Sequence, residues 1–188
     1  MLTRPRPLLG LILLASLVVR VWYWLEVRGT YLLTVPYLDA HDYHVWARAL
    51  VAGDWGRGEP YWMGPLYPHL LAISYALFGP GGLAMVAAQW ALTLLNIWLV
   101  WRLGRRWLGD GGGLLAAALF AAYGPPVFYA GLRLMVTVVT TLMLLVAWQA
   151  DRARAAGSGA RPWLLLALLV GLTATPRGNV LVLLPLLP

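Results

Sequence analysis

Residues 83–106 read LAMVAAQWALTLLNIWLVWRLGRR, and this stretch decides the class of protein. The run from Leu83 to Trp101 contains no charged residue and is close to the length of about 20 apolar residues that a helix needs to cross a bilayer. Three arginines, Arg102, Arg105 and Arg106, follow it directly. Arginine-rich loops stay on the cytoplasmic side of a membrane, so this run is predicted to span the membrane from outside to inside.

The rest of the chain repeats this pattern of apolar runs separated by short polar loops. Of its 188 residues, 61% are hydrophobic and 11% are charged, against about 25% charged in soluble proteins. This composition predicts an all-α, polytopic membrane protein with about five transmembrane helices, forming a single membrane domain over residues 1–188. The other predicted spans are Pro7–Trp24, Leu114–Tyr129, Leu132–Trp148 and Trp163 onward, the last one broken at Pro176.

The basic residues indicate how the chain is oriented. The formal net charge is +7, and all 14 basic residues are arginines. They form short clusters at every second loop rather than a continuous basic stripe, which argues for membrane topology and against a nucleic-acid partner. We therefore expect a multi-pass protein of the cell inner (plasma) membrane with a cytoplasmic N-terminus. The clusters are Arg4 and Arg6, then Arg102, Arg105 and Arg106, then Arg152, Arg154 and Arg161.

Residues 25–82 form the predicted extracytoplasmic loop, which contains most of the titratable groups. Five of the seven carboxylates and all three histidines lie there. An amphipathic interfacial helix is predicted over Ala40–Ala52, with Asp39 as its N-cap. Pro65–Phe78 is short for a span and is predicted to be an interfacial or re-entrant helix. One face of the first helix presents Tyr43, Trp46, Ala47 and Leu50 at helical spacing.

A family resemblance rests on the order of residues from the first helix to the end of this loop. After an arginine in the first helix, the chain presents in turn Asp39, Tyr43, Ala47, Gly53-Asp54, Pro65-Leu-Tyr-Pro68 and Phe78-Gly79. This order resembles the start of the polyprenyl-phosphate-sugar-dependent glycosyltransferases of the GT-C fold. The nearest group is that of the dolichyl-phosphate-mannose protein mannosyltransferases and aminoarabinose transferases. The resemblance extends over the chain but covers only the N-terminal part of the family fold.

The resemblance implies a reaction and a catalytic residue. A sugar on a polyprenyl phosphate in the outer leaflet is attacked by a hydroxyl of a protein, lipid or glycan acceptor, and the family's first extracytoplasmic loop presents an Asp to the reaction centre. The matching residue here is Asp39, expected to act as catalytic base. A base also needs a partly desolvated place at the membrane face, where its pKa can be tuned. A helix cap is the alternative role for Asp39, and the two are compatible.

Other polar residues of the loop are candidates for substrate or metal binding. Asp42, Tyr43, His44 and His69 are expected to contact the substrate, and for His69 the alternative is to face water or headgroups. His41 and His44 are three residues apart and so share a helix face, and together with Asp39 they are a possible site for a divalent metal ion, since imidazole and carboxylate groups bind zinc or manganese. A solvated or acceptor-binding role is the commoner one for such a pattern.

Two arginines interrupt apolar runs and need a partner or a route to water. Arg20 is expected to extend to the interface or to pair with Glu26, with lipid phosphate as the alternative partner. Arg177 lies where Pro176 breaks the fifth span, so it is expected to bind substrate phosphate or the carbonyl groups that the break sets free.

Some features depart from the family pattern and leave other functions open. Ala40 follows Asp39 where relatives have Glu, and residues 128–133 lack the second acid of the family, which leaves Asp42, Asp54 or Glu59 as replacements. The chain ends inside an apolar run, so we expect a fragment of a larger fold. The alternatives are a non-catalytic membrane scaffold or truncated remnant, or a small transporter. A transporter would place acids near the bilayer midplane rather than in one outer loop.

Overall fold

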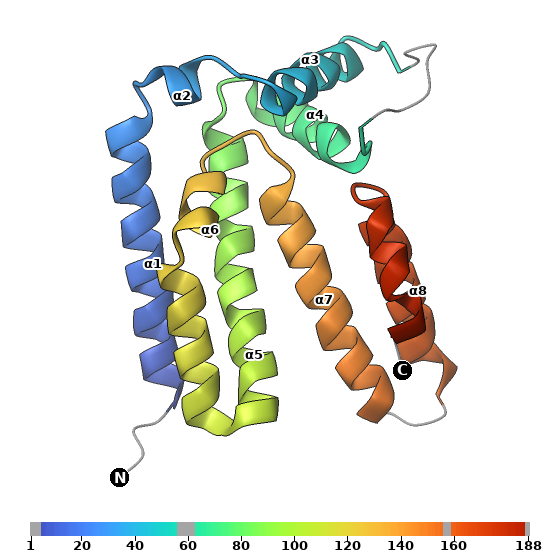
Figure 1. Cartoon of the computed structure of the whole chain (residues 1–188). Helices are drawn as coiled ribbons and strands as arrows, with labels where there is room; N and C mark the ends of the chain where they lie inside the picture. Colours follow the sequence, from blue (N-terminus) through green and yellow to red (C-terminus); the bar gives the residue numbers. More distant parts are fainter. Residues whose placement is uncertain (1–4, 56–62, 156–158, 187–188) are drawn as a thin grey trace.

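The computed structural model describes residues 5–55, 63–155 and 159–186, and within these ranges the chain is helical with no strand (Figure 1). This confirms the all-α fold. Glu59 lies outside the described residues. The elements in chain order are α1 (Pro5–Val27), α2 (Tyr31–Thr34), α3 (Asp39–Val51), α4 (Leu66–Phe78), α5 (Leu83–Ala122), α6 (Gly124–Tyr129), α7 (Val136–Ala155), α8 (Ala160–Ala174) and the 3₁₀ segment η1 (Gly178–Leu186).

α5 consists of two antiparallel arms joined by a sharp turn at Gly109, whose φ of 76° suits glycine (Figure 1). The arms touch through small residues. A Cβ added at Gly104 would lie 3.1 Å from the Cα of Gly113, and one added at Gly113 would lie 2.7 Å from the backbone nitrogen of Arg105. The structure therefore confirms that the chain turns back after Arg106, and small residues let two apolar helices approach closely.

Two predicted helix boundaries were wrong. The second arm of α5 ends at Ala122 instead of continuing to Tyr129, because Pro125 and Pro126 start a separate short helix, α6. α7 begins at Val136 and continues to Ala155, so the charged residues expected in a loop occupy its last turns. Alanine and arginine favour a helix there, and arginine suits a helix C-terminus.

The long helices pack in a row, α1 on α5, α5 on α7 and α7 on α8. Ile97 and Trp101 of α5 join Leu9 of α1 in one buried cluster, and Val146 of α7 packs with Leu166 of α8 in another. By length and apolar composition two described helices are candidate membrane spans, namely α1 over residues 6–27 and α5, which contains both arms. α4 and α8 are shorter apolar helices. The number of about five spans stays a prediction.

The break at Pro176 is confirmed, and the chain reverses there. α8 ends at Ala174, and η1 returns alongside α8 (Figure 1). The turn between them lies at the same end of the molecule as α3 and α4, which lie across the ends of the long helices. The turn of α5, the C-terminal end of α7 and the start of α1 lie at the other end (Figure 1). Arginine clusters and acidic loop are thus separated, as the sequence predicts.

Arg20 differs from the prediction. It is only 1% exposed, so it neither extends to the interface nor pairs with Glu26, which is exposed. Its guanidinium donates to the backbone carbonyl of Ser16 at 3.0 Å and to the Ser16 hydroxyl. Ser16 lies one turn earlier on the same buried face of α1, whereas Glu26 faces elsewhere because six residues turn a helix well past that face. Two oxygens of Ser16, in the same helix, therefore accept hydrogen bonds from part of the Arg20 guanidinium.

Candidate functional site

Asp39 is the first residue of α3 and not its N-cap. Leu38 occupies the cap position with a φ of 50°, and no side chain caps the helix there. The chain turns sharply at Leu38, so the helix begins one residue earlier than predicted. Asp39 is exposed and Asp42 is half-buried in the same first turn. Carboxylates are favoured at this position because the helix dipole is positive at its N-terminus.

α3 lies on α4 through the face that the sequence predicted. Tyr43, Trp46, Ala47 and Leu50 are all buried there, which confirms the amphipathic pattern. Tyr43 is only 1% exposed, and its ring meets that of Tyr67 edge to face, with 5.0 Å between the centroids. Tyr43 therefore holds the two helices together directly behind the first turn that contains the two carboxylates.

The structure brings Arg177 to this end of α3. Gly64, just before α4, packs on the turn after α8 so closely that a Cβ there would lie 2.5 Å from the Cα of Pro176. Burial raises the pKa of the Tyr43 hydroxyl, and the negative charge of Asp39 adds to this effect while the positive charge of Arg177 opposes it. Asp42 also raises this pKa. The charges of two carboxylates and a guanidinium thus act on one buried phenol.

A chain of three polar side chains lies beside this group. Nδ1 of His44 and the Tyr75 hydroxyl are 2.7 Å apart, and Nε of Arg133 donates to the same hydroxyl at 3.1 Å. Burial lowers the pKa of His44, and the positive charge of Arg133 lowers it further. Gln89 of α5 fixes the segment that precedes Arg133 by donating to the carbonyl of Leu132 at 2.6 Å.

Sequence reasoning missed Arg133 and Tyr75. A usable signal existed for Arg133, since it is the only charged residue between Asp110 and Asp151. A lone charge in an apolar segment is by default a candidate functional residue. Tyr75 gave no such signal, because its role depends on partners 31 and 58 residues away.

His69 and His41 do not share the contacts of His44. Nδ1 of His69 is 2.6 Å from the carbonyl oxygen of Pro65, and its ring borders an apolar groove of about 350 Å³. His41 is exposed, while His44 is directed to Tyr75. In the described ranges no three His, Asp or Glu side chains are placed to hold a metal ion, and this includes the possible set of Asp39, His41 and His44. The groove is lined by Leu50, Val51, Trp55, His69, Ala72, Ile73 and Ala76.

A comparison with known protein families shows to which family the chain belongs. The family described as dolichyl-phosphate-mannose-protein mannosyltransferase matches residues 60–187, well over half of the chain. The chain belongs to this family. It is therefore a member of the GT-C glycosyltransferases, and the family supports membrane localisation and glycosyltransferase activity. No curated protein and no solved structure matches the chain.

The family match and the candidate site overlap in part. Arg133, Arg177 and His69 lie inside the matched residues of this mannosyltransferase family, whereas Asp39, Asp42 and His44 precede them. Contacts described above join the two parts, since His44 bonds to Tyr75 and the ring of Tyr43 packs on that of Tyr67. The acidic end of α3 is thus attached to the part of the chain that the family defines.

Proposed function

We propose that this protein transfers a sugar from a polyprenyl-phosphate donor to an acceptor hydroxyl at the outer face of the membrane, with Asp39 as catalytic base. The observation that carries this proposal is that the first turn of α3, with Asp39 and Asp42, and the turn with Arg177 lie at the same end of the helical bundle, where Gly64 packs on Pro176 (Figure 1). In the proposed orientation this is the extracytoplasmic end and the arginine clusters face the cytoplasm. Residues 25–82 are then the extracytoplasmic segment.

The reaction requires an anionic and a cationic group near each other. The acceptor oxygen forms a bond to the anomeric carbon as the bond from that carbon to the phosphate oxygen breaks. The Asp39 carboxylate takes the proton of the hydroxyl, which makes the oxygen a better nucleophile. The leaving polyprenyl phosphate gains negative charge, and the exposed guanidinium of Arg177 supports it.

The remaining candidates serve binding and positioning. Asp42, beside Asp39, offers a carboxylate to sugar or acceptor hydroxyls. Tyr43 and His44 hold the acidic turn in place, because one packs on Tyr67 and the other bonds to Tyr75. The apolar groove beside His69 would seat isoprene units of the donor lipid, which need an apolar surface close to the phosphate.

Replacing Asp39 tests the proposed base. Membranes that contain the full protein are supplied with polyprenyl-phosphate mannose labelled in the sugar, and label that leaves the organic phase with protein, lipid or glycan acceptors is measured. Asp39→Asn keeps the size of the side chain but removes its basicity. We expect transfer to fall by about 10²-fold or more, the usual contribution of a general base.

Glu26→Gln is the matched control, because it removes an equally exposed carboxylate, at the end of α1, to which no role in the site is assigned. We expect this variant to transfer sugar at the wild-type rate. Wild-type transfer by Asp39→Asn would overturn the role of Asp39, and so would an equal loss in Glu26→Gln. A wild-type protein that transfers no sugar from any polyprenyl phosphate would favour the membrane scaffold.

A further inference from the structure

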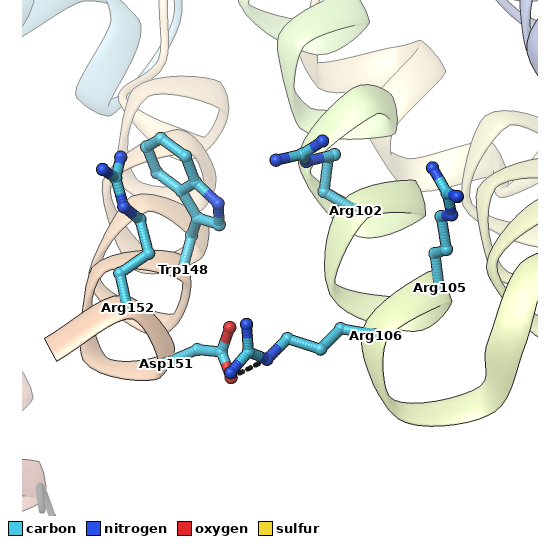
Figure 2. Close-up of a pocket in the computed structure, with 6 residues that line it drawn as sticks. All are labelled: Arg102, Arg105, Arg106, Trp148, Asp151 and Arg152. Carbon is cyan, nitrogen blue, oxygen red and sulfur yellow. Dashed lines mark ion pairs between the residues drawn. The ribbon is translucent and has the colours of Figure 1, made fainter. Parts of the chain in front are cut away.

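A basic pocket lies at the end of the molecule opposite Asp39. It has a volume of about 540 Å³ and opens between the turn of α5 and the last turns of α7 (Figure 2). Four arginines and one aspartate line it, so the lining has a net charge of +3. These charged residues are Arg102, Arg105, Arg106, Arg152 and Asp151, and Trp148 completes the wall.

Acidic partners neutralise only part of this charge. Nε of Arg106 pairs with Asp151 at 2.7 Å across the pocket, and Arg105 pairs with Asp110 on the rim. Figure 2 shows Arg106 reaching from the α5 side to Asp151 on α7. Within the described ranges no carboxylate forms an ion pair with Arg102 or Arg152. Two guanidinium groups therefore remain available for an anion.

Tryptophans hold these two guanidinium groups in place. Arg102 lies over the ring of Trp98 at 5.4 Å, and Arg152 lies over the ring of Trp148 at 4.9 Å. The two tryptophan rings meet edge to face, with 6.2 Å between their centroids, and so link α5 to α7. Stacking on an aromatic ring orients a guanidinium and leaves its edge free for hydrogen bonds.

We propose that this pocket binds the phosphate headgroup of an anionic glycerophospholipid. Arginine forks match phosphate oxygens in pairs, and basic pockets between helices at a membrane surface suit such headgroups. A lipid fits better than a soluble anion because the pocket lies beside α5, which is apolar and long enough to cross a membrane, so that its surface can receive the acyl chains. Tryptophan side chains are also enriched at the level of the lipid headgroups.

The proposed lipid stabilises the contact between α5 and α7. Four arginines around one pocket repel each other, and a bound phosphate reduces this repulsion. Anionic lipid should therefore raise the melting temperature of the protein. This inference does not depend on the proposed sugar transfer, because the pocket shares no residue with the Asp39 site.

The test titrates the purified full chain in neutral detergent with phosphatidylglycerol or with phosphatidylcholine, and bound lipids are counted by native mass spectrometry while melting temperature is recorded. The wild type should bind phosphatidylglycerol and melt at a higher temperature with it, and phosphatidylcholine should have a much smaller effect. The double variant Arg102→Gln with Arg152→Gln should bind phosphatidylglycerol about tenfold more weakly or worse.

The control is Arg154→Gln with Arg161→Gln, which removes the same charge at the same end from exposed residues outside the pocket. It should keep wild-type affinity. Equal loss in both double variants would overturn the proposal in favour of general surface charge, as would equal binding of both lipids to the wild type. A second measurement adds inorganic phosphate or pyrophosphate to the wild type in competition with the lipid, and it needs no variant. If these ions stabilise the protein as much as the lipid does, the pocket binds a soluble anion instead.

Discussion

His44 is the residue whose surroundings lead to the clearest prediction on pH. Its ring bonds to the Tyr75 hydroxyl, and Arg133 bonds to the same oxygen. Burial lowers the pKa of His44 from its ordinary value of 6.5, and Arg133 lowers it further. The folded protein therefore keeps His44 neutral at a pH where the unfolded chain already binds a proton.

The stability contributed by a neutral His44 should be complete above pH 6.5 and be lost as the pH falls through the lowered pKa. His44→Gln keeps an uncharged group that can bond to Tyr75 but cannot take up the proton. We expect the melting temperature of the wild type to drop between about pH 7.5 and about pH 5.5, and the drop to be smaller in His44→Gln.

His69→Gln is the control for this effect, since His69 bonds to the carbonyl of Pro65 and not to Tyr75. Its melting temperature should show the wild-type dependence on pH. The interpretation of the His44 site is wrong if His69→Gln, and not His44→Gln, flattens the curve.

At the scale of elements, the contact of Gly64 with the turn after α8 holds the two halves of the candidate site together. A Cβ at residue 64 would lie 2.5 Å from the Cα of Pro176 and 2.8 Å from the carbonyl oxygen of Thr175. These are backbone atoms, which cannot rotate away. Gly64→Ala should therefore destabilise the protein by about 1–3 kcal/mol, the usual cost of overpacking, and separate Arg177 from α3.

Gly171→Ala provides the comparison, because it adds the same methyl group to α8 where no atom lies within 4 Å. Melting temperature and sugar transfer should both fall in Gly64→Ala and stay near wild type in Gly171→Ala. Wild-type behaviour of both variants would show that the turn at Pro176 does not rest on Gly64.

Local patterns in the sequence predicted most elements and few of their contacts. The helices were predicted from the apolar runs. Their reversals were predicted from the arginines after Trp101 and from the break at Pro176. The buried face of α3 followed from helical spacing. Helix ends were less predictable, because Pro125 and the sharp turn at Leu38 act against the surrounding pattern.

The contacts of the candidate site depend on residues far apart in the chain, which no periodicity reveals. The charge of Arg177 affects the pKa of Tyr43 because Gly64 lets the turn after α8 pack closely on the start of α4. Arg20 was likewise predicted to extend to the membrane interface, because the sequence does not show which face of α1 is covered by other helices. Asp39 could be singled out from sequence because it stands in a polar loop within an apolar chain.

The whole molecule separates two kinds of charge at its two ends. The start of α3 with Asp39 and Asp42 and the turn with Arg177 lie at one end, and the pocket lined by arginines lies at the other. The family match places the chain among the GT-C glycosyltransferases. We expect the first end to receive the phosphate of the sugar donor, and the second to receive an ordinary anionic lipid.

Native mass spectrometry of the protein taken from its own membranes tests the central claim most directly, because it identifies the lipids that the chain retains. The account predicts a bound polyprenyl phosphate, with or without its sugar, that is retained in the variant Arg102→Gln with Arg152→Gln and lost in Arg177→Gln. A wild-type protein that retains only glycerophospholipids would contradict a lipid-linked sugar donor. Asp39 would then be no more than the first residue of α3.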